Sequence, residues 1–320
     1  MKTILVSGAS GIIGYGILRS LKKSGKKFKL IGTTIYGDSA ASGFCDIFEL
    51  APQTSDPKYM NWLLGVIKKH GVEMIIPGIE IDMYKWSEQI AKLKESGAKI
   101  LLNSLELISI CNDKWLFYEK LKEANSPYII ETTLNADFDL LKNKFQLPFL
   151  LKPRHGHGSK GIVSVDAKKT FLKYKSDIGE NLMAQPIIGN DNDEFTTSAF
   201  CDGNGSYYST MTFRRKLSKD GYTEKAEVAT VEGMDEAIKN LCVLFKPIGP
   251  TNFQFRQDKT GLKLLEINPR ISSSTSLRTA FGYNESLMAV EFLLENKIPE
   301  QPPIRQGKAV RYMEDLIFYR

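Results

Sequence analysis

Short apolar runs alternate with helical patterns through the N-terminal third of the chain. The apolar runs are residues 4–6, 29–32, 74–77 and 98–102, and the helical patterns between them include 57–70 and 84–96. Strands that alternate with helices in this way are typical of a parallel, doubly wound sheet. The pattern therefore predicts an α/β domain over roughly the first 105 residues.

A glycine-rich turn, residues 8–14, follows the first apolar run. Its G-x-x-G-x-x-G spacing lets the backbone approach a ligand, and the helix that follows attracts negative charge at its N-terminus. Such a turn also occurs in NAD(P)-dependent short-chain-type dehydrogenases and epimerases, and Tyr118 and Lys122 have the spacing of their proton relay. The second apolar run ends in Gly-Thr-Thr, without the acidic residue that would hold a ribose, which disfavours this interpretation.

The middle of the chain contains a basic stretch that is rich in glycine. It combines three basic side chains with three glycines: Lys152, Arg154, Gly156, Gly158, Lys160 and Gly161. Outward-facing backbone amides and positive charge together suit a loop that folds over phosphates, whereas the alternative is a basic hairpin turn without a ligand. His155 and His157 lack a third metal ligand nearby, so we expect them to act as loop donors.

A predicted hairpin near the C-terminus gathers oxygen ligands. Glu266 and Asn268 stand two residues apart on an extended strand, so both side chains leave the same face. Gln254 lies on the partner strand, and Arg270 follows the strand end. One carboxylate and two amide oxygens suit Mg²⁺ that takes its other ligands from phosphates. A solvated polar strand face is the alternative.

Composition and charge limit the classes of protein that remain. The chain has 320 residues, of which 42% are hydrophobic and 25% charged, with a net charge of +6. Basic residues alternate with acidic ones, which disfavours a nucleic-acid partner. The four cysteines have no metal-binding spacing, the N-terminus lacks the apolar core of a signal peptide, and no run reaches membrane-spanning length. We therefore expect a cytoplasmic protein with neither a membrane nor a nucleic-acid partner.

In chain order, several stretches resemble the ATP-grasp superfamily, particularly the carboxylate–amine ligases that are similar to carbamoyl phosphate synthase. The resemblance is carried by the N-terminal domain, by Asp113-Lys114 at a helix start, by the basic loop after Lys152, by 185–194, and by Glu266-Ile-Asn268-Pro-Arg270. It implies an ATP-grasp fold that is α/β, with an α+β C-terminal part. The expected division is a Rossmann-like pre-ATP-grasp domain (1–110), a small lid subdomain (111–185) and a C-terminal ATP-grasp subdomain (186–320).

The resemblance also implies a role for each motif. Lys114 and Lys152 would reach the phosphates of ATP, with Lys152 and Arg270 as the catalytic residues. A lid loop would cover the phosphates, and its residues are Gly156, Gly158, Ser159, Lys160 and Gly161. A second segment would line adenine, and its residues are Gln185, Pro186, Ile187 and Ile188. Glu194 would hold the ribose, with Asp191 or Asp193 in the acidic turn before it as the alternatives. Gln254, Glu266 and Asn268 would bind Mg²⁺, or Mn²⁺ in its place.

The expected activity is that of an ADP-forming ligase, which activates a carboxylate as an acyl phosphate for attack by an amine. Small-molecule carboxylates and amines are then the substrates, and a homodimer is the expected assembly. The alternatives are a kinase that stops at a phosphorylated product, the dehydrogenase or epimerase above, and a nucleotide-binding regulator without turnover. Substrate contacts are expected from the glycine turn and from a set of polar residues, Glu80, Asp82, Arg214, Arg215, Ser272, Ser273 and Ser274.

Overall fold

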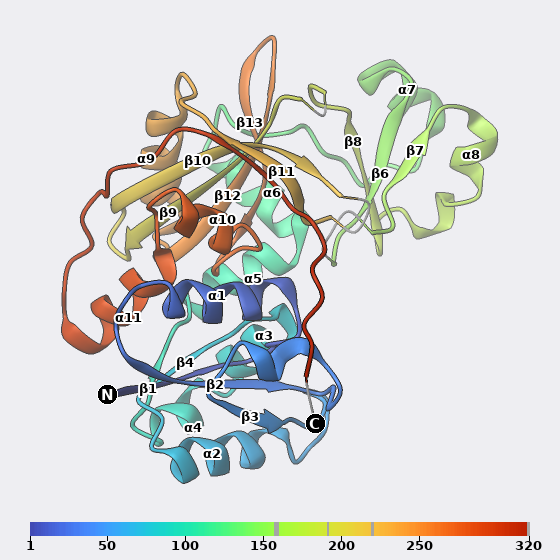
Figure 1. The fold of residues 1–320 in the computed structure, drawn as a ribbon. Helices are drawn as coiled ribbons and strands as arrows, with labels where there is room; N and C mark the ends of the chain where they lie inside the picture. The colour runs from blue at the N-terminus through green and yellow to red at the C-terminus, as the bar shows by residue number, and fades with distance from the viewer. Residues whose placement is uncertain (157–159, 191, 219–220, 319–320) are drawn as a thin grey trace.

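The computed structural model describes residues 1–156, 160–190, 192–218 and 221–318. Its strands form three sheets, which are well separated in Figure 1. A five-stranded sheet lies at the bottom of that view, a six-stranded sheet above it, and a three-stranded sheet projects to the upper right. The three sheets meet around one central region, which contains the candidate site.

The N-terminal sheet is parallel throughout, with strand order β3-β2-β1-β4-β5. Its strands are β1 (Lys2–Val6), β2 (Phe28–Thr34), β3 (Ile47–Leu50), β4 (Met74–Ile76) and β5 (Lys99–Ile100). The predicted doubly wound α/β sheet is thus confirmed. The sequence pattern missed β3, whose residues are only partly buried or exposed, and it overestimated the length of β5.

Helices cover both faces of the N-terminal sheet because successive β1 side chains point in opposite directions. Ile4 and Val6 pack with α1 (Ile12–Lys22) on one face. Leu5 packs on the other face, which is covered by α2 (Tyr59–His70), α3 (Glu80–Glu88) and α4 (Ile90–Lys94). The single helix predicted at 84–96 is wrong in extent, since α3 begins earlier and Gln89, outside helical geometry, separates it from α4.

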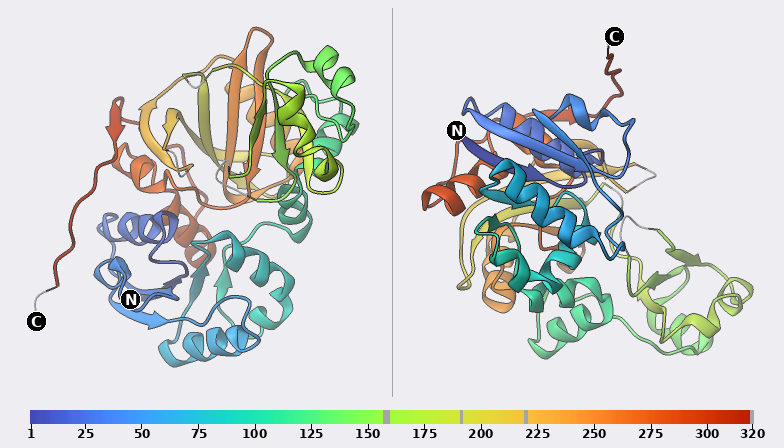
Figure 2. Two further views of the ribbon diagram at one scale, coloured as in Figure 1. Left: turned by 90° about the vertical axis from the view of Figure 1, so that its right-hand side faces the viewer. Right: turned by 90° about the horizontal axis from the view of Figure 1, so that it is seen from below.

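Helices α5 (Leu105–Asn112) and α6 (Lys114–Glu123) lead to the antiparallel three-stranded sheet, whose order is β7-β6-β8. Its elements are β6 (Phe149–Pro153), β7 (Val163–Val165) and β8 (Leu182–Pro186), with α7 (Phe138–Phe145) and α8 (Lys168–Leu172). Phe138, Phe149 and Phe171 form its aromatic core, with ring centroids 5.5–6.4 Å apart. This unit stands apart from the other two sheets in the right-hand view of Figure 2.

The six-stranded sheet has the order β13-β12-β9-β10-β11-β14, and each of its neighbouring strand pairs is antiparallel. Its strands are β9 (Glu194–Asp202), β10 (Tyr207–Leu217), β11 (Thr223–Val228), β12 (Ile248–Asp258), β13 (Gly261–Asn268) and β14 (Lys308–Val310). Phe195, Phe253 and Phe255 pack on one face with α9 (Met234–Phe245). Side chains at alternate positions of β9 and β12 are polar, so the opposite face presents polar groups to the site.

The predicted hairpin is formed by β12 and β13, with Gln254 directly opposite Glu266. A register shift follows this pair, because Phe255 is opposite Leu264 and Leu265 is left as an extra residue. Glu266 and Asn268 consequently share a face with their cross-strand partners, Gln254 and Asn252.

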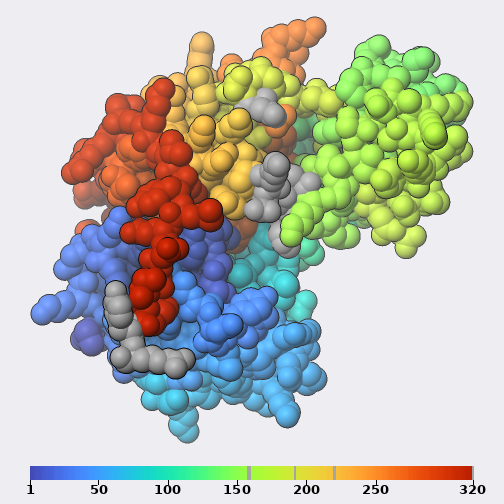
Figure 3. All heavy atoms as spheres, turned by 45° about the vertical axis from the view of Figure 1, so that its right-hand side comes forward, coloured from blue at the N-terminus to red at the C-terminus, as the bar shows by residue number. Residues whose placement is uncertain are grey.

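The C-terminal region contains two helices, α10 (Thr275–Ala280) and α11 (Glu285–Glu295). Gly282, with φ at 104°, reverses the chain between them. After β14 the chain runs extended back across the N-terminal domain, where Leu316 contacts Gly43 (Figures 1 and 3).

Among the described residues, no helix is both long and apolar enough to span a membrane.

Candidate functional site

A cavity of about 520 Å³ opens where the three sheets meet. Its walls include the turn after β1, the start of α3, strands of the three-stranded sheet, and the polar face of the six-stranded sheet. Most of the residues expected from the sequence to bind ATP or metal line this cavity: Lys114, Lys152, Gly156, Lys160, Gln185, Pro186, Ile188, Glu194, Gln254, Glu266, Asn268 and Arg270. Segments as far apart as 114 and 270 therefore contribute to one site.

Two lysines enter the cavity from the side of the three-stranded sheet. Lys114 is the first residue of α6, which begins after the Asp113 side chain accepts a hydrogen bond from the Trp115 amide at 2.8 Å. The Lys114 ammonium donates to the Gly156 carbonyl at 2.7 Å, so it is tied to the glycine-rich loop. Arg154 donates to both carboxylate oxygens of Asp113, at 3.2 and 2.5 Å, which fixes the loop against the helix start.

Burial changes the titration of both lysines. Desolvation lowers the pKa of Lys152 to about 8, opposed by the nearby Glu266 carboxylate. Desolvation also lowers the pKa of Lys114, again opposed by Glu266. Removing an ammonium group from water is costly unless a negative charge compensates it. Two such groups beside a single carboxylate provide the electrostatic conditions for binding a polyanion.

The glycine-rich loop is described in part. Gly161 has φ at 75°, and a Cβ at that position would lie 2.9 Å from the Pro153 ring, so glycine is required there. His155 is exposed, and its Nδ1 is 3.0 Å from the Asn112 carbonyl, consistent with a hydrogen-bonding role. The predicted loop residues His157, Gly158 and Ser159 lie outside the described residues.

The segment expected to line adenine borders the cavity at three of its four residues. Gln185, Pro186 and Ile188 line it, whereas Ile187 does not and is 41% exposed. The Gln185 amide nitrogen donates to the Thr132 hydroxyl at 2.7 Å, which orients the side chain. Sequence reasoning missed the apolar residues that complete this wall: Ile130, Leu150, Ile162 and Leu265.

Glu194 lies at the cavity wall in an ion-pair cluster. Its carboxylate is 2.9 Å from the Arg215 guanidinium and 3.0 Å from that of Arg256. Both Glu194 and Arg215 are buried, so the pairing compensates charges that have left water. Arg215 also donates to the Gln254 amide oxygen. Arg256 was missed because its partner is 62 residues away in the sequence.

The three candidate metal ligands lie together at the end of the hairpin. The Asn268 amide nitrogen donates to a Glu266 oxygen at 3.1 Å, and the Asn268 oxygen accepts from Arg270 at 3.0 Å. The described residues include no group of three His, Cys, Asp or Glu side chains suited to a metal. One carboxylate with two amide oxygens fits Mg²⁺ that draws further ligands from bound phosphates and water.

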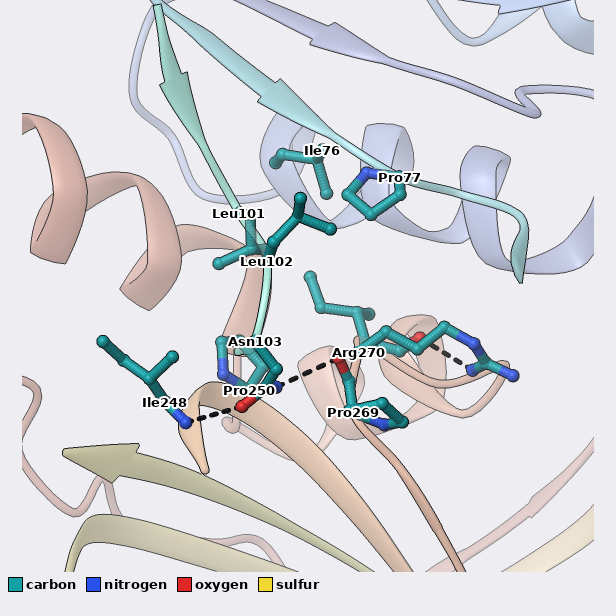
Figure 4. Close-up of a pocket in the computed structure, with 10 residues that line it drawn as sticks. Ile76, Pro77, Leu101, Leu102, Asn103, Ile248, Pro250, Pro269 and Arg270 are labelled. Carbon is teal, nitrogen blue, oxygen red and sulfur yellow. Dashed lines mark hydrogen bonds between the residues drawn. The ribbon is translucent and has the colours of Figure 1, made fainter. Parts of the chain in front are cut away.

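Arg270 is held from two directions. Its guanidinium donates to the Glu80 carboxylate at 2.5 Å and to the Ile271 carbonyl at 3.0 Å. Asn103, which follows β5, fixes the preceding residue, because its amide nitrogen donates to the Pro269 carbonyl at 3.0 Å. The Asn103 oxygen also accepts from the Ile248 amide at 2.7 Å, as Figure 4 shows. Asn103 was not anticipated from the sequence.

The expected substrate contacts divide into two groups. Glu80, Ser272, Ser273 and Arg215 line the cavity, as does Gly11 of the glycine turn. The other expected residues make contacts within the protein. Asp82 is buried and accepts a hydrogen bond from the Thr54 hydroxyl at 2.6 Å, and the buried Ser274 hydroxyl is 2.9 Å from that of Thr223. Arg214 is exposed, and its guanidinium lies over the Phe195 ring.

Gly8 and Gly14 have a structural role in the glycine turn, and the two residues considered for a dehydrogenase relay contact other parts of the chain. A Cβ on Gly14 would lie 2.3 Å from the Gly8 carbonyl, so these two glycines allow β1 and α1 to pack closely. Tyr118 and Lys122 are on α6, and neither is among the described residues that line the cavity. The Tyr118 hydroxyl is instead 3.5 Å from Glu131.

Comparison with known sequences identifies relatives over most of the chain. Residues 180–316 match the family model described as ATP-grasp in the biosynthetic pathway with Ter operon. Carbamoyl phosphate synthase large chains from Thermoanaerobacter sp. (strain X514) and Thermotoga neapolitana are 26% and 23% identical over 261 and 358 aligned residues. These alignments cover 71% and 100% of this chain, but only 24% and 32% of the relatives. The chain thus spans about a quarter to a third of their length.

Solved structures share the fold at lower identity. N5-carboxyaminoimidazole synthetase from Staphylococcus aureus, complexed with ADP, has a TM-score of 0.74 and 19% identity, with coverage of 95% of this chain and 80% of that chain. The biotin carboxylase domain of 2-oxoglutarate carboxylase from Hydrogenobacter thermophilus, complexed with MgADP, ADP and bicarbonate, has a TM-score of 0.70 and 17% identity, covering 96% and 73%. The predicted ATP-grasp fold is therefore confirmed, and the chain is similar to an ATP-grasp family over residues 180–316 and to carbamoyl phosphate synthase large chains over most of its length.

Proposed function

We propose that the chain is an ADP-forming carboxylate–amine ligase. The observation that carries the proposal is the convergence of three groups on one cavity: two partly desolvated lysines, the oxygen-rich end of the hairpin, and Arg270. This arrangement supplies what phosphoryl transfer requires, because the protein mainly positions the reactants and compensates charge. ATP and Mg²⁺ are the proposed nucleotide and metal, with Mn²⁺ as a proposed substitute. The complexes of two structural neighbours, one with ADP and one with MgADP, support this choice.

In the first proposed step, a carboxylate oxygen attacks the γ-phosphorus of ATP. A new O–P bond forms, the bond from that phosphorus to the β,γ-bridging oxygen breaks, and its electron pair leaves with ADP. Lys114 and Lys152 hold the transferred phosphate from the side of the three-stranded sheet, and Arg270 stabilises the charge at the end of the hairpin. A guanidinium fixed by neighbouring groups provides this stabilisation without reorganising during the reaction.

In the second proposed step, an amine nitrogen attacks the acyl carbon. A C–N bond forms, the C–O bond to the phosphate breaks, phosphate leaves with the electron pair, and the nitrogen releases a proton to water. Glu266 and Asn268, with Gln254, would hold Mg²⁺, which when bound neutralises phosphate charge. The Gln254 and Asn268 oxygens already accept hydrogen bonds from Arg215 and Arg270, so each would exchange a guanidinium contact for the metal.

We also propose the division into residues 1–110, 111–185 and 186–320, a homodimer, and a cytoplasmic location. The division is supported by the three sheets, each of which falls within one proposed part except for Pro186 at the end of β8. Helices α7 and α8 accompany the middle sheet, as a separate lid would require.

The test is an acyl-phosphate assay on the full chain. MgATP, a panel of carboxylates and hydroxylamine are combined, and ADP and hydroxamate are measured, because hydroxylamine traps acyl phosphates. Equal amounts of ADP and hydroxamate show that a carboxylate is activated. An amide that forms when an amine replaces hydroxylamine supports the ligase, whereas a phosphorylated product that no amine converts to an amide supports the kinase. The Lys152→Ala and Glu266→Ala variants should lose turnover while circular dichroism stays unchanged, with Arg214→Ala as the matched control at an exposed position. Full activity in both variants would contradict the proposed site.

A further inference from the structure

One end of the cavity is built by the N-terminal domain, across from the three-stranded sheet. It is lined by residues 11–13 of the turn after β1, by 78–81 at the start of α3, and by Ser272, Ser273 and Arg270. We call this region the acceptor end. The lysines expected to bind phosphates, Lys114 and Lys152, come from α6 and β6 instead. The acceptor end is therefore where a carboxylate substrate would lie.

The wall of the acceptor end is rich in isoleucine. Ile12, Ile13, Ile79 and Ile81 all line the cavity, and Ile81 is 58% exposed. A single exposed apolar side chain is ordinary on a protein surface. Four in one concave wall are typical of a pocket that covers an apolar part of a ligand. The substrate should accordingly have an apolar portion that these side chains remove from water.

The charge at the acceptor end is balanced. Its charged residues, among those described, are Glu80 and Arg270, whose side chains are 2.5 Å apart. Among the other described cations of the cavity, Arg215 and Arg256 pair with Glu194, Lys114 is bonded to the loop carbonyl of Gly156, and Lys152 and Lys160 lie on β6 and in the loop that follows it. A phosphorylated substrate would bring extra negative charge to a place without a surplus cation. A zwitterion adds no net charge.

Resting on the proposed function, we propose that the activated carboxylate belongs to an α-amino acid with an apolar side chain. The substrate carboxylate is directed toward Arg270 and the phosphate, its ammonium toward Glu80, and its side chain toward the isoleucine wall. An ion pair and a zwitterion complement each other because each charge of the ligand then lies beside its opposite in the protein. Glu80 thus selects for the amino group.

The experiment compares acids that differ in one group, in the hydroxylamine assay with MgATP. L-Leucine is compared with 4-methylpentanoate, which is the same molecule without the amino group, and with O-phospho-L-serine. We expect kcat/KM for leucine to exceed that for either alternative by about tenfold or more, the size of one charged hydrogen bond. In Glu80→Gln the preference for leucine over 4-methylpentanoate should fall to about threefold or less, because an amide attracts ammonium far less than a carboxylate does. Glu95→Gln, an exposed residue of the same domain, is the control and should keep the preference.

The outcomes separate the two proposals. Equal use of leucine and 4-methylpentanoate by the wild type, or a preference for O-phospho-L-serine, would overturn the amino-acid inference and leave the ligase intact. An unchanged preference in Glu80→Gln would overturn the role of Glu80. If no acid in the panel yields hydroxamate, the ligase proposal itself fails, and the amino-acid inference fails with it.

Discussion

Arg270 and Glu80 are 190 positions apart in the sequence, and their side chains meet at 2.5 Å in the cavity. The contact joins the end of the β12–β13 hairpin to the first turn of α3 in the N-terminal domain. The contacts of the Arg270 guanidinium with Glu80 and with Asn268 together hold it at the cavity wall. The N-terminal domain therefore helps to orient the residue that is proposed to stabilise phosphoryl transfer.

Replacing Arg270 should impair chemistry more than nucleotide binding. Arg270→Ala is expected to lower kcat by about 100-fold or more, as removal of one preorganised charge-stabilising donor does in other enzymes. The dissociation constant for ATP should change by less than about threefold, because Lys114 and Lys152 remain. Arg270→Lys should recover only part of the activity, since lysine lacks the fork that contacts Glu80 and Asn268 together. Calorimetry and steady-state kinetics measure the two effects, and a loss of ATP binding equal to the loss of kcat would contradict the assignment.

The low pKa of Lys152, about 8, predicts a pH dependence of ATP binding. The free protein loses this ammonium charge as the pH rises through about 8, so ATP affinity should decline by up to tenfold per pH unit above that value. Lys152→Arg should remove the decline because arginine stays charged. Titrations at about pH 7, 8 and 9 make the comparison, and a constant wild-type affinity over that range would contradict the prediction.

The same pKa has the opposite consequence for folding of the unliganded chain. The ordinary lysine pKa is 10.5, and the folded value is lower, so the folded state binds fewer protons between the two values. Its free energy of unfolding should therefore gain a contribution from Lys152 as the pH rises from about 8 to about 10. Urea denaturation of the wild type and Lys152→Met isolates this contribution as a difference in pH slope.

Arg278 and Glu285 form a buried ion pair beneath the loop that carries Ser272. Their residues are 0% and 1% exposed, and Arg278 also donates to the Ser272 hydroxyl at 2.8 Å. Arg278→Met or Glu285→Leu alone should reduce the free energy of unfolding by about 3–5 kcal/mol, because each leaves an uncompensated buried charge. The double variant should recover much of that loss. Denaturation by urea tests this, and a double variant as unstable as the sum of the singles would contradict it.

A surface pair provides the control for the buried one. Lys297 and Glu291 are 3.3 Å apart, and the lysine side chain is well exposed. Glu291 also contacts Lys26, so Lys297→Met is the cleaner change. It should alter the free energy of unfolding by less than about 1 kcal/mol.

Neighbouring arginines on β10 should differ sharply in importance. Arg215 is buried and contacts Glu194 and Gln254, whereas Arg214 is exposed on the other side of the strand. Arg215→Met should destabilise the fold by about 3 kcal/mol, since Glu194 would lose one of its two partners. Arg214→Met should stay within about 0.5 kcal/mol of the wild type. Thermal unfolding of the two variants distinguishes the positions, and similar losses would contradict the assigned burial.

Local patterns predicted much of this architecture because the relevant information is short-range. The alternating strands and helices of the N-terminal sheet depend on apolar periodicity, and the pairing of Gln254 with Glu266 depends on a hairpin with a short turn. The break between α3 and α4 was missed because the helical pattern continues across Gln89. Local propensity does not report where packing interrupts a helix.

Residues that act through distant partners were harder to predict. Asn103 supports Pro269 from a segment 166 positions away, and Arg256 meets Glu194 across two strands. Nothing in the immediate neighbourhood of either residue indicates its partner. Arg214 and Arg215 illustrate the same limit, because adjacent basic residues look equivalent in a sequence until the strand assigns them to opposite faces.

The course of the chain after β14 has a mechanical consequence. Arg311 donates to the carbonyls of Thr223 at 2.7 Å and Ser273 at 2.5 Å, and the following residues reach Gly43. The N-terminal and six-stranded parts also share one apolar core, which includes Ile4, Phe200 and Val290. The aromatic core of the three-stranded sheet, by contrast, draws only on residues 136–184. We therefore expect the first two parts to move as one rigid unit, so that a change in access to the cavity would require the third part to move relative to them.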